Sequence, residues 1–243
     1  MKFDEDYQSE NIEDRRGQRA SGAKLAGGGG LVLTIVIVVA YVALGGDARE
    51  GLEVAQKVNQ VRERATTPQD GADGAGLPDP TQDRAAKLVS AVLRDTEVTW
   101  GPLFEEMGKT YREPKLVLFD DAVDSACGYQ TAAVGPFYCP ADEKAYLDLT
   151  FFGELATRFG APGDFAQAYV VAHEVGHHVQ NLLGTSTRVH RQKQGLPEAE
   201  ANALTVRLEL QADCYSGVWA HHAEEARDIL EEGDVEEGLA AFF

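Results

Sequence analysis

The chain is short of positive charge. Its 243 residues hold 22 Lys and Arg against 40 Asp and Glu, which gives a formal net charge of −18. Binding to a polyanion needs an extended basic patch, because neutralised phosphates supply most of the affinity. The basic residues that cluster are few and lie near the N-terminus: Arg15, Arg16, Arg19 and Lys24. We therefore expect no nucleic-acid partner and a solvated, acidic surface.

Cysteine is also scarce, with only Cys127, Cys139 and Cys214. The first two bracket a short loop rich in turn residues, which predicts a disulfide between them; two unpaired core thiols are the alternative. Closing a loop of this size contributes about 3 kcal/mol in the chain-entropy model. Disulfides persist in exported domains. Cys214 lies in a helical pattern, which predicts a buried free thiol.

Long apolar runs are limited to one. Residues 31–44 carry no charge, and with their flanking glycines they extend over 27–46, about the length that crosses a hydrocarbon core. A signal-peptide core and a buried strand are the alternatives for so short a run. Basic residues precede it while Asp47 and Glu50 follow, so the positive-inside rule places the N-terminus in the cytoplasm. We expect a single-pass anchor in the cell membrane, with the rest of the chain outside the cytoplasm.

Composition divides the chain into four parts. Residues 1–26 are polar and charged, which predicts a cytosolic tail before the transmembrane helix at 27–46. Residues 47–80 are expected to be a stalk and linker, because their Gly, Pro and Asp content buries too little apolar surface to fold. The folded domain is then expected over 81–243.

Strands are predicted early in this domain. Residues 115–119 (KLVLF) and 145–152 (AYLDLTFF) have the apolar and aromatic composition of strands. Residues 131–134 are expected to form a short edge strand. Helical patterns cover 82–94 and 100–107 before them. The mixture predicts an α+β fold.

Two longer helices follow, and their ends are marked. Asp164 is expected to cap the first, with Gln167 as its partner in a capping box, and Gly184 ends it. Pro197 opens the second, whose pattern runs to about Ala226.

The first of these helices carries the sequence His173-Glu174-Val175-Gly176-His177. Histidines four residues apart lie on one helical face, so their imidazoles can converge on a single ion. Glu174 is rotated by about 100° from His173, which lets its carboxylate reach a water on that ion. Gly176 costs about 1 kcal/mol of helix propensity relative to Ala. Close approach by another segment would explain that glycine.

The second helix is predicted to supply a third ligand. A catalytic zinc takes three protein ligands and keeps a position open for water. Glu209 is the candidate, and Asp213, four residues later on the same face, is placed to orient a ligating imidazole. The remaining histidines are expected to be surface or locally bonded side chains: His178, His190, His221 and His222.

These motifs resemble a known family. The segments AYVVAHEVGHHVQNLLG and GLPEAEANALTVRLELQADCYSGVWAHH, with SACG, GPFYCP and YLDLTFF upstream, are similar to the bacterial family described as putative neutral zinc metallopeptidase. H-E-x-x-H followed by E-x-x-A-D is also similar to the glutamate-ligand zinc peptidases, the group containing thermolysin. The resemblance covers about residues 82–240 and implies a zincin-like domain, in which a small edge sheet packs on an active-site helix pair. It implies one zinc ion and these roles: ligands His173, His177 and Glu209, general base Glu174, and orienting carboxylate Asp213.

The predicted activity is that of a membrane-anchored zinc endopeptidase. It would hydrolyse a peptide or protein substrate by attack of a zinc-bound water that Glu174 activates. A zinc-stabilised binding protein and a zinc hydrolase acting on another bond are the alternatives, and a closed site with four protein ligands would favour the first. Members of the family generally continue beyond the helix expected to begin at 235–239, so we expect a truncated or different C-terminal tail.

Overall fold

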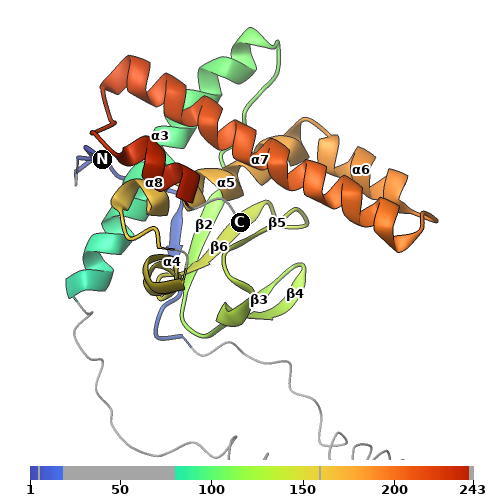
Figure 1. The fold of residues 1–243 in the computed structure, drawn as a ribbon, viewed down its shortest axis with the longest axis horizontal. Coiled ribbons are helices and arrows are strands. Elements are labelled where there is room, and N and C mark those ends of the chain that lie inside the picture. The colour runs from blue at the N-terminus through green and yellow to red at the C-terminus, as the bar shows by residue number, and fades with distance from the viewer. Residues whose placement is uncertain (5, 19–79, 159, 241–243) are drawn as a thin grey trace, which may run out of the picture. The chain divides into compact units, whose positions relative to one another are not determined.

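The computed structural model describes residues 1–4, 6–18, 80–158 and 160–240 (Figure 1). These residues form one compact unit that combines helices with two small sheets. The predicted α+β class is therefore confirmed for the domain itself.

A four-stranded sheet in the order β1-β2-β6-β5 forms the centre of the fold. β1 (Ile12–Asp14) is parallel to β2 (Lys115–Phe119), and β2 is parallel to β6 (Lys144–Asp148). β5 (Phe137–Cys139) is antiparallel to β6 and forms one edge of the sheet. The sheet therefore has a single antiparallel strand, which forms one edge and is the last part of the predicted disulfide loop.

Side chains alternate between the two faces of β2, as the period of a strand requires. Leu116 and Leu118 belong to the main core beneath the helices. Val117 and Phe119 belong to a smaller apolar cluster on the other face, which also holds Cys139. Both faces of the central strand are thus buried from Leu116 to Phe119, which explains why these four residues are all apolar.

The longer helices lie above and beside the sheet in the view of Figure 1. They are α3 (Pro80–Glu106), α5 (Asp164–Leu182) and α7 (Glu198–Arg227). Trp219 of α7 is fully buried, and its indole N–H donates a 2.7 Å hydrogen bond to Asp95 of α3. Asp95 also accepts two hydrogen bonds from Arg227, so a buried charge is paired where the two helices meet.

Three shorter helices complete the domain: α4 (Phe151–Arg158), α6 (Thr185–Lys193) and α8 (Asp234–Ala240). Since α4 starts at Phe151, the strand predicted over 145–152 ends early and its last residues begin a helix. α6 packs against α7 and was not predicted. α8 confirms the helix expected near 235–239.

A hairpin lies next to the edge strand. β3 (Ala122–Ser125) pairs with β4 (Gly128–Thr131), and one 3₁₀ turn, Ala132–Val134, leads toward β5. The predicted edge strand at 131–134 is therefore wrong, because that segment is mostly the 3₁₀ turn. The edge of the main sheet lies a few residues later, in β5.

The ends of the two long helices agree with the predictions except at one cap. Gly184 follows α5 with a left-handed φ of 74°, a conformation that glycine adopts without strain. Asp164, however, makes no capping hydrogen bond, and the residue at the cap is Gly163. The Asp164 carboxylate instead accepts a hydrogen bond from the amino group of Met1.

Residues 1–18 are part of the domain, so the cytosolic tail predicted over 1–26 is wrong in its described part. Ile12 lies opposite Leu116 in the parallel pairing of β1 with β2. Just before β1, Ser9 and Asn11 both donate hydrogen bonds to the buried carboxylate of Glu97. These contacts tie the segment to α3 and to the sheet.

The predicted fold also included a transmembrane helix before the domain, and this part of the prediction needs a correction. No helix in the described part of the chain is long and apolar enough to cross a bilayer, and residues 27–46 lie outside that part, as do 47–79. Residues 1–18 and the chain from Pro80 onward form one compact unit, which a single crossing between them would split across a membrane. The single-pass anchor is therefore wrong, and the location outside the cytoplasm stays a prediction.

Candidate active site

The helices α5 and α7 cross where Gly176 meets Ala212. A Cβ atom on Gly176 would lie 2.8 Å from the carbonyl oxygen of Ala212, closer than such atoms approach in folded proteins. Ala212 is itself fully buried. The glycine between the two histidines thus lets the helices touch, as predicted. The contact brings the polar face of α7 against the polar face of α5.

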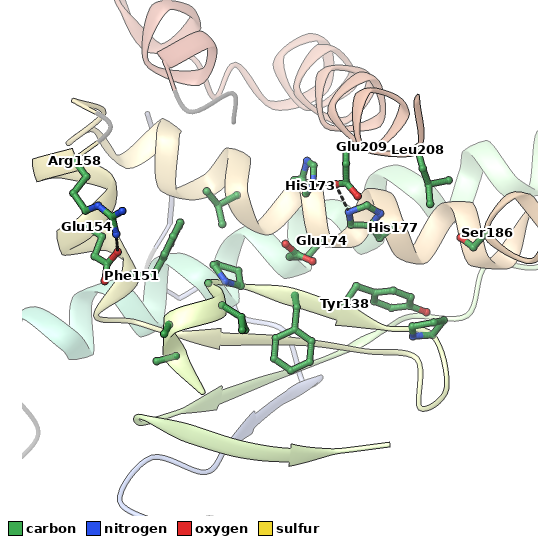
Figure 2. A pocket seen from close by; sticks show the side chains of 18 residues that line it. Tyr138, Phe151, Glu154, Arg158, His173, Glu174, His177, Ser186, Leu208 and Glu209 are labelled. Atoms are coloured by element: carbon green, nitrogen blue, oxygen red, sulfur yellow. Dashed lines mark hydrogen bonds and ion pairs between the residues drawn. The ribbon is translucent and has the colours of Figure 1, made fainter. Parts of the chain in front are cut away.

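Two histidines and one glutamate converge beside this crossing (Figure 2). The Nε2 atom of His173 lies 3.3 Å from a carboxylate oxygen of Glu209, and Nε2 of His177 lies 3.1 Å from the same oxygen. One donor atom from each of the three residues lies within 4.8 Å of the others. The structure therefore brings together the three side chains that the sequence singled out as ligands.

The second ring nitrogen of each imidazole, Nδ1, is held by a hydrogen bond. Nδ1 of His173 donates to Asp213 at 2.9 Å, and Nδ1 of His177 donates to the side-chain oxygen of Gln180 at 3.0 Å. When the rings are neutral, these bonds keep the proton on Nδ1 and leave Nε2 free as a ligand atom.

Gln180 was missed by the sequence analysis. It is fully buried, and its amide also donates a 2.6 Å hydrogen bond to the carbonyl of Leu208 in α7. Its position three residues after His177 on the same helical face was the available signal.

Glu174 lies in the cleft beside the two imidazoles. It is buried, and its Oε2 atom has no hydrogen-bond partner among the described residues. Burial raises the pKa of this carboxyl above its usual range, while His177 and His173 act in the opposite direction. A buried acceptor without a partner is costly in a folded protein, so the position is specialised for a group outside the chain.

The cluster favours positive charge at its centre. Burial alone would lower the pKa of His173, but the hydrogen bond to Glu209 and the charges of Glu174 and Asp213 raise it to about 9. The hydrogen bonds from His173 and His177 hold the pKa of Glu209 well below its usual range. The carboxylates thus attract a cation to the point where the two Nε2 atoms meet.

The cluster opens into a cleft of about 660 Å³. α5 forms one side of it, and Glu154 and Arg158 of α4 lie toward one end, while Ser186 of α6 lies toward the other (Figure 2). The opposite wall is formed by residues 132–138 and Pro140. The clustered side chains lie between the two ends, so an extended ligand can pass across them in both directions.

The other histidines lie apart from this cleft. His178 is fully buried, with Nδ1 accepting from the Tyr138 hydroxyl at 2.9 Å and Nε2 donating to the carbonyl of Arg112 at 2.6 Å. Burial lowers the pKa of His178, which keeps the ring neutral. His221 pairs with Glu225 on the surface. Cys214 is exposed, so the prediction that its thiol is buried is wrong.

The donor set fits zinc. Two imidazole nitrogens and one carboxylate oxygen are the ligands of a catalytic zinc site that keeps its fourth position open. Among the described residues no fourth His, Cys, Asp or Glu joins the group, and the open side faces the cleft. An α+β domain with this helix pair fits the zincin-like class of metal-dependent hydrolases.

The chain belongs to the family described as putative neutral zinc metallopeptidase, which it matches over residues 1–242. It is 44% identical over 250 residues to the uncharacterized protein YpfJ of Escherichia coli K12, covering 99% of this chain and 82% of that protein. It is 43% identical over 163 residues to the uncharacterized protein Mb2605 of Mycobacterium bovis, covering 63% of this chain and 53% of that protein. No solved structure matches the chain significantly.

Proposed function

We propose that the protein is a zinc-dependent endopeptidase that uses His173, His177 and Glu209 to hold one zinc ion. The observation that carries the proposal is the convergence of both Nε2 atoms on one oxygen of Glu209, beside a buried Glu174 oxygen without a partner. Membership in a zinc metallopeptidase family supports the metal and the substrate class, a peptide or protein.

Zinc held by His173, His177 and Glu209 would supply a Lewis acid, which would lower the pKa of a bound water and polarise the scissile carbonyl. Glu174 accepts a proton from the attacking water and delivers it to the nitrogen of the leaving amine. Its burial beside both imidazoles and the unpartnered Oε2 atom support this role. Asp213 and Gln180 keep the two imidazoles in the orientation that presents Nε2.

The shape of the cleft favours cleavage within a chain over removal of a terminal residue. Lining residues extend past the histidines toward both α4 and α6, so substrate residues can be held on either side of the scissile bond. Three candidate ligands facing an open cleft also favour catalysis over a closed structural site, which would take four.

The test uses the full chain, because residues 1–18 belong to the domain. The purified protein is loaded with zinc, its metal content is measured, and it is incubated with an unbiased peptide library. We expect one zinc per chain and cleavage at internal bonds that stops with a chelator and returns with zinc. Stoichiometric zinc without any cleavage would instead support the binding-protein alternative, and release of terminal residues alone would refute the endopeptidase assignment.

A further inference from the structure

The wall of the cleft opposite α5 lies within a single disulfide loop. Residues 132–138 line the cleft, and all of them lie between Cys127 and Cys139, which are joined by a disulfide. The predicted pairing of these cysteines is thus present in the structure. Cys127 follows β3 at the tip of the β3–β4 hairpin, so the disulfide ties this tip to the edge strand β5.

The rest of this wall is largely exposed and is held by short contacts. The 3₁₀ turn Ala132–Val134 contains no buried residue, and Val134 is 56% exposed. β5 pairs with β6 over only three residues. On the side facing α5, the Tyr138 hydroxyl donates to His178 and accepts from the amide of Asn181 at 3.2 Å. Ala132 and Phe137 add apolar contacts, since both pack on the cluster that holds Cys139. The position of the wall therefore depends on this small contact, on the polar ties and on the disulfide.

The two ends of the disulfide differ in exposure. Cys139 is fully buried among Val117, Phe119, Val123 and Tyr146, whereas Cys127 is exposed. A thiol reductant can therefore approach from the Cys127 side. No candidate metal ligand lies within the loop, since these come from α5 and α7.

We propose that Cys127 and Cys139 are positioning residues for the substrate cleft, whose disulfide makes substrate binding sensitive to thiol reductants while sparing the metal site. This inference rests on the proposed peptidase function. A glutathione thiolate attacks Sγ of Cys127, forms a mixed disulfide and releases Cys139 as a thiolate, which takes up a proton. A second glutathione thiolate attacks the glutathione sulfur of the mixed disulfide, which frees Cys127 as a thiolate and leaves oxidised glutathione.

The test compares the oxidised and reduced full chain in a Cys214→Ser background, so that only this pair responds. Reduced and oxidised glutathione set the redox state, and zinc content is measured in each sample. We expect reduction to raise KM for a cleaved peptide by about tenfold while kcat and zinc content stay within about twofold, since the wall binds substrate and does not bind metal. Reoxidation should restore KM.

A Cys127→Ser, Cys139→Ser double variant should reproduce the reduced state without any reductant. If KM is the same in the oxidised and reduced protein, or if reduction releases zinc, the proposal is overturned. Hydrogen exchange of the backbone amides of residues 129–139 tests the positioning role separately from the peptidase function. Should the oxidised protein cleave nothing, the peptidase function fails, and the positioning role is then decided by exchange: faster exchange on reduction supports it, and unchanged exchange overturns it.

Discussion

The carboxylate of Asp213 accepts a 2.9 Å hydrogen bond from Nδ1 of His173, across the crossing of α7 and α5. The bond fixes both the orientation of the ring and the nitrogen that carries the proton, so that Nε2 faces Glu209. Asp213 and Glu209 lie one turn apart on α7, and each contacts a different nitrogen of the His173 ring. This division of roles between two carboxylates of one helix leads to the first prediction.

Glu209→Ala should weaken zinc binding by far more than about 100-fold, because it removes a ligand. Asp213→Asn should weaken it by only about 10–100-fold, because the amide still contacts the ring but no longer stabilises it with a charge. Competition titration against a zinc-binding dye gives both affinities. The reverse order of effects would show that Asp213 is the ligand and Glu209 is not.

Gln180→Leu should loosen the orientation of the His177 ring, as Asp213→Asn should loosen that of the His173 ring. The substitution removes the acceptor for Nδ1 of His177 and the hydrogen bond to the carbonyl of Leu208. We expect zinc affinity to fall by about 10–100-fold. Gln194→Leu, at an exposed position after α6, is the matched control and should leave the affinity unchanged. Equal zinc affinities in the Gln180→Leu and Gln194→Leu variants would show that Gln180 does not support zinc binding.

Glu174→Gln should retain zinc but lose peptidase activity by about 10²–10⁴-fold, since the amide cannot take the proton from the attacking water. Metal analysis and peptide cleavage are measured on the same sample. The same substitution at the exposed Glu198 of α7 is the control and should change neither quantity. Near-normal turnover in a zinc-loaded Glu174→Gln protein would refute the assigned role.

Gly176→Ala should destabilise the domain by about 1–3 kcal/mol, because the new methyl group overlaps the backbone of Ala212 and the helices must separate. Gly217→Ala is the control, since a Cβ there meets no atom within 4 Å. On helix propensity alone it should be stabilising by up to about 1 kcal/mol. Urea unfolding measures both free energies, and a neutral Gly176→Ala would contradict the tight crossing.

Glu13→Gln tests the docking of the N-terminal strand. The Glu13 carboxylate accepts hydrogen bonds from Lys144 of β6 and from Arg15, which lower its pKa below the usual 4.5. A lowered pKa in the folded state contributes stability above the usual pKa, and this contribution is lost as the pH falls through the folded-state value. We expect a loss of up to about 1 kcal/mol at pH 7, as for a largely exposed pair, and no difference in strong acid.

Urea unfolding of Glu13→Gln at pH 7 and in acid measures this loss, with Glu10→Gln as the control on an exposed residue of the same segment. An unchanged free energy of unfolding at pH 7 would show that the contacts of Glu13 with Lys144 and Arg15 do not stabilise the domain.

The sequence by itself determined the features that depend on neighbours along the chain. His173 and His177 share a helical face because four residues make about one turn. Gly184 marks a helix end because glycine adopts the left-handed φ of that position without strain. The strand KLVLF was evident from its composition. The short disulfide loop was evident from the spacing of its cysteines and its turn residues.

Only the tertiary structure decided which distant groups meet. Residues 1–18 look like a polar tail, yet three of them pair with β2, because backbone hydrogen bonds in a parallel strand need no apolar pattern. The spacing of Gln180 from His177 permits a contact, but only the structure shows that the amide bonds to the ring. The edge strand β5 is too short to show an alternation. Glu209 and Asp213 were placed on one helical face by their spacing, but which of them approaches Nε2 of His173 depends on where α7 crosses α5. That crossing is set by the contact of Gly176 with Ala212, a packing interaction between helices that no local period of the sequence records.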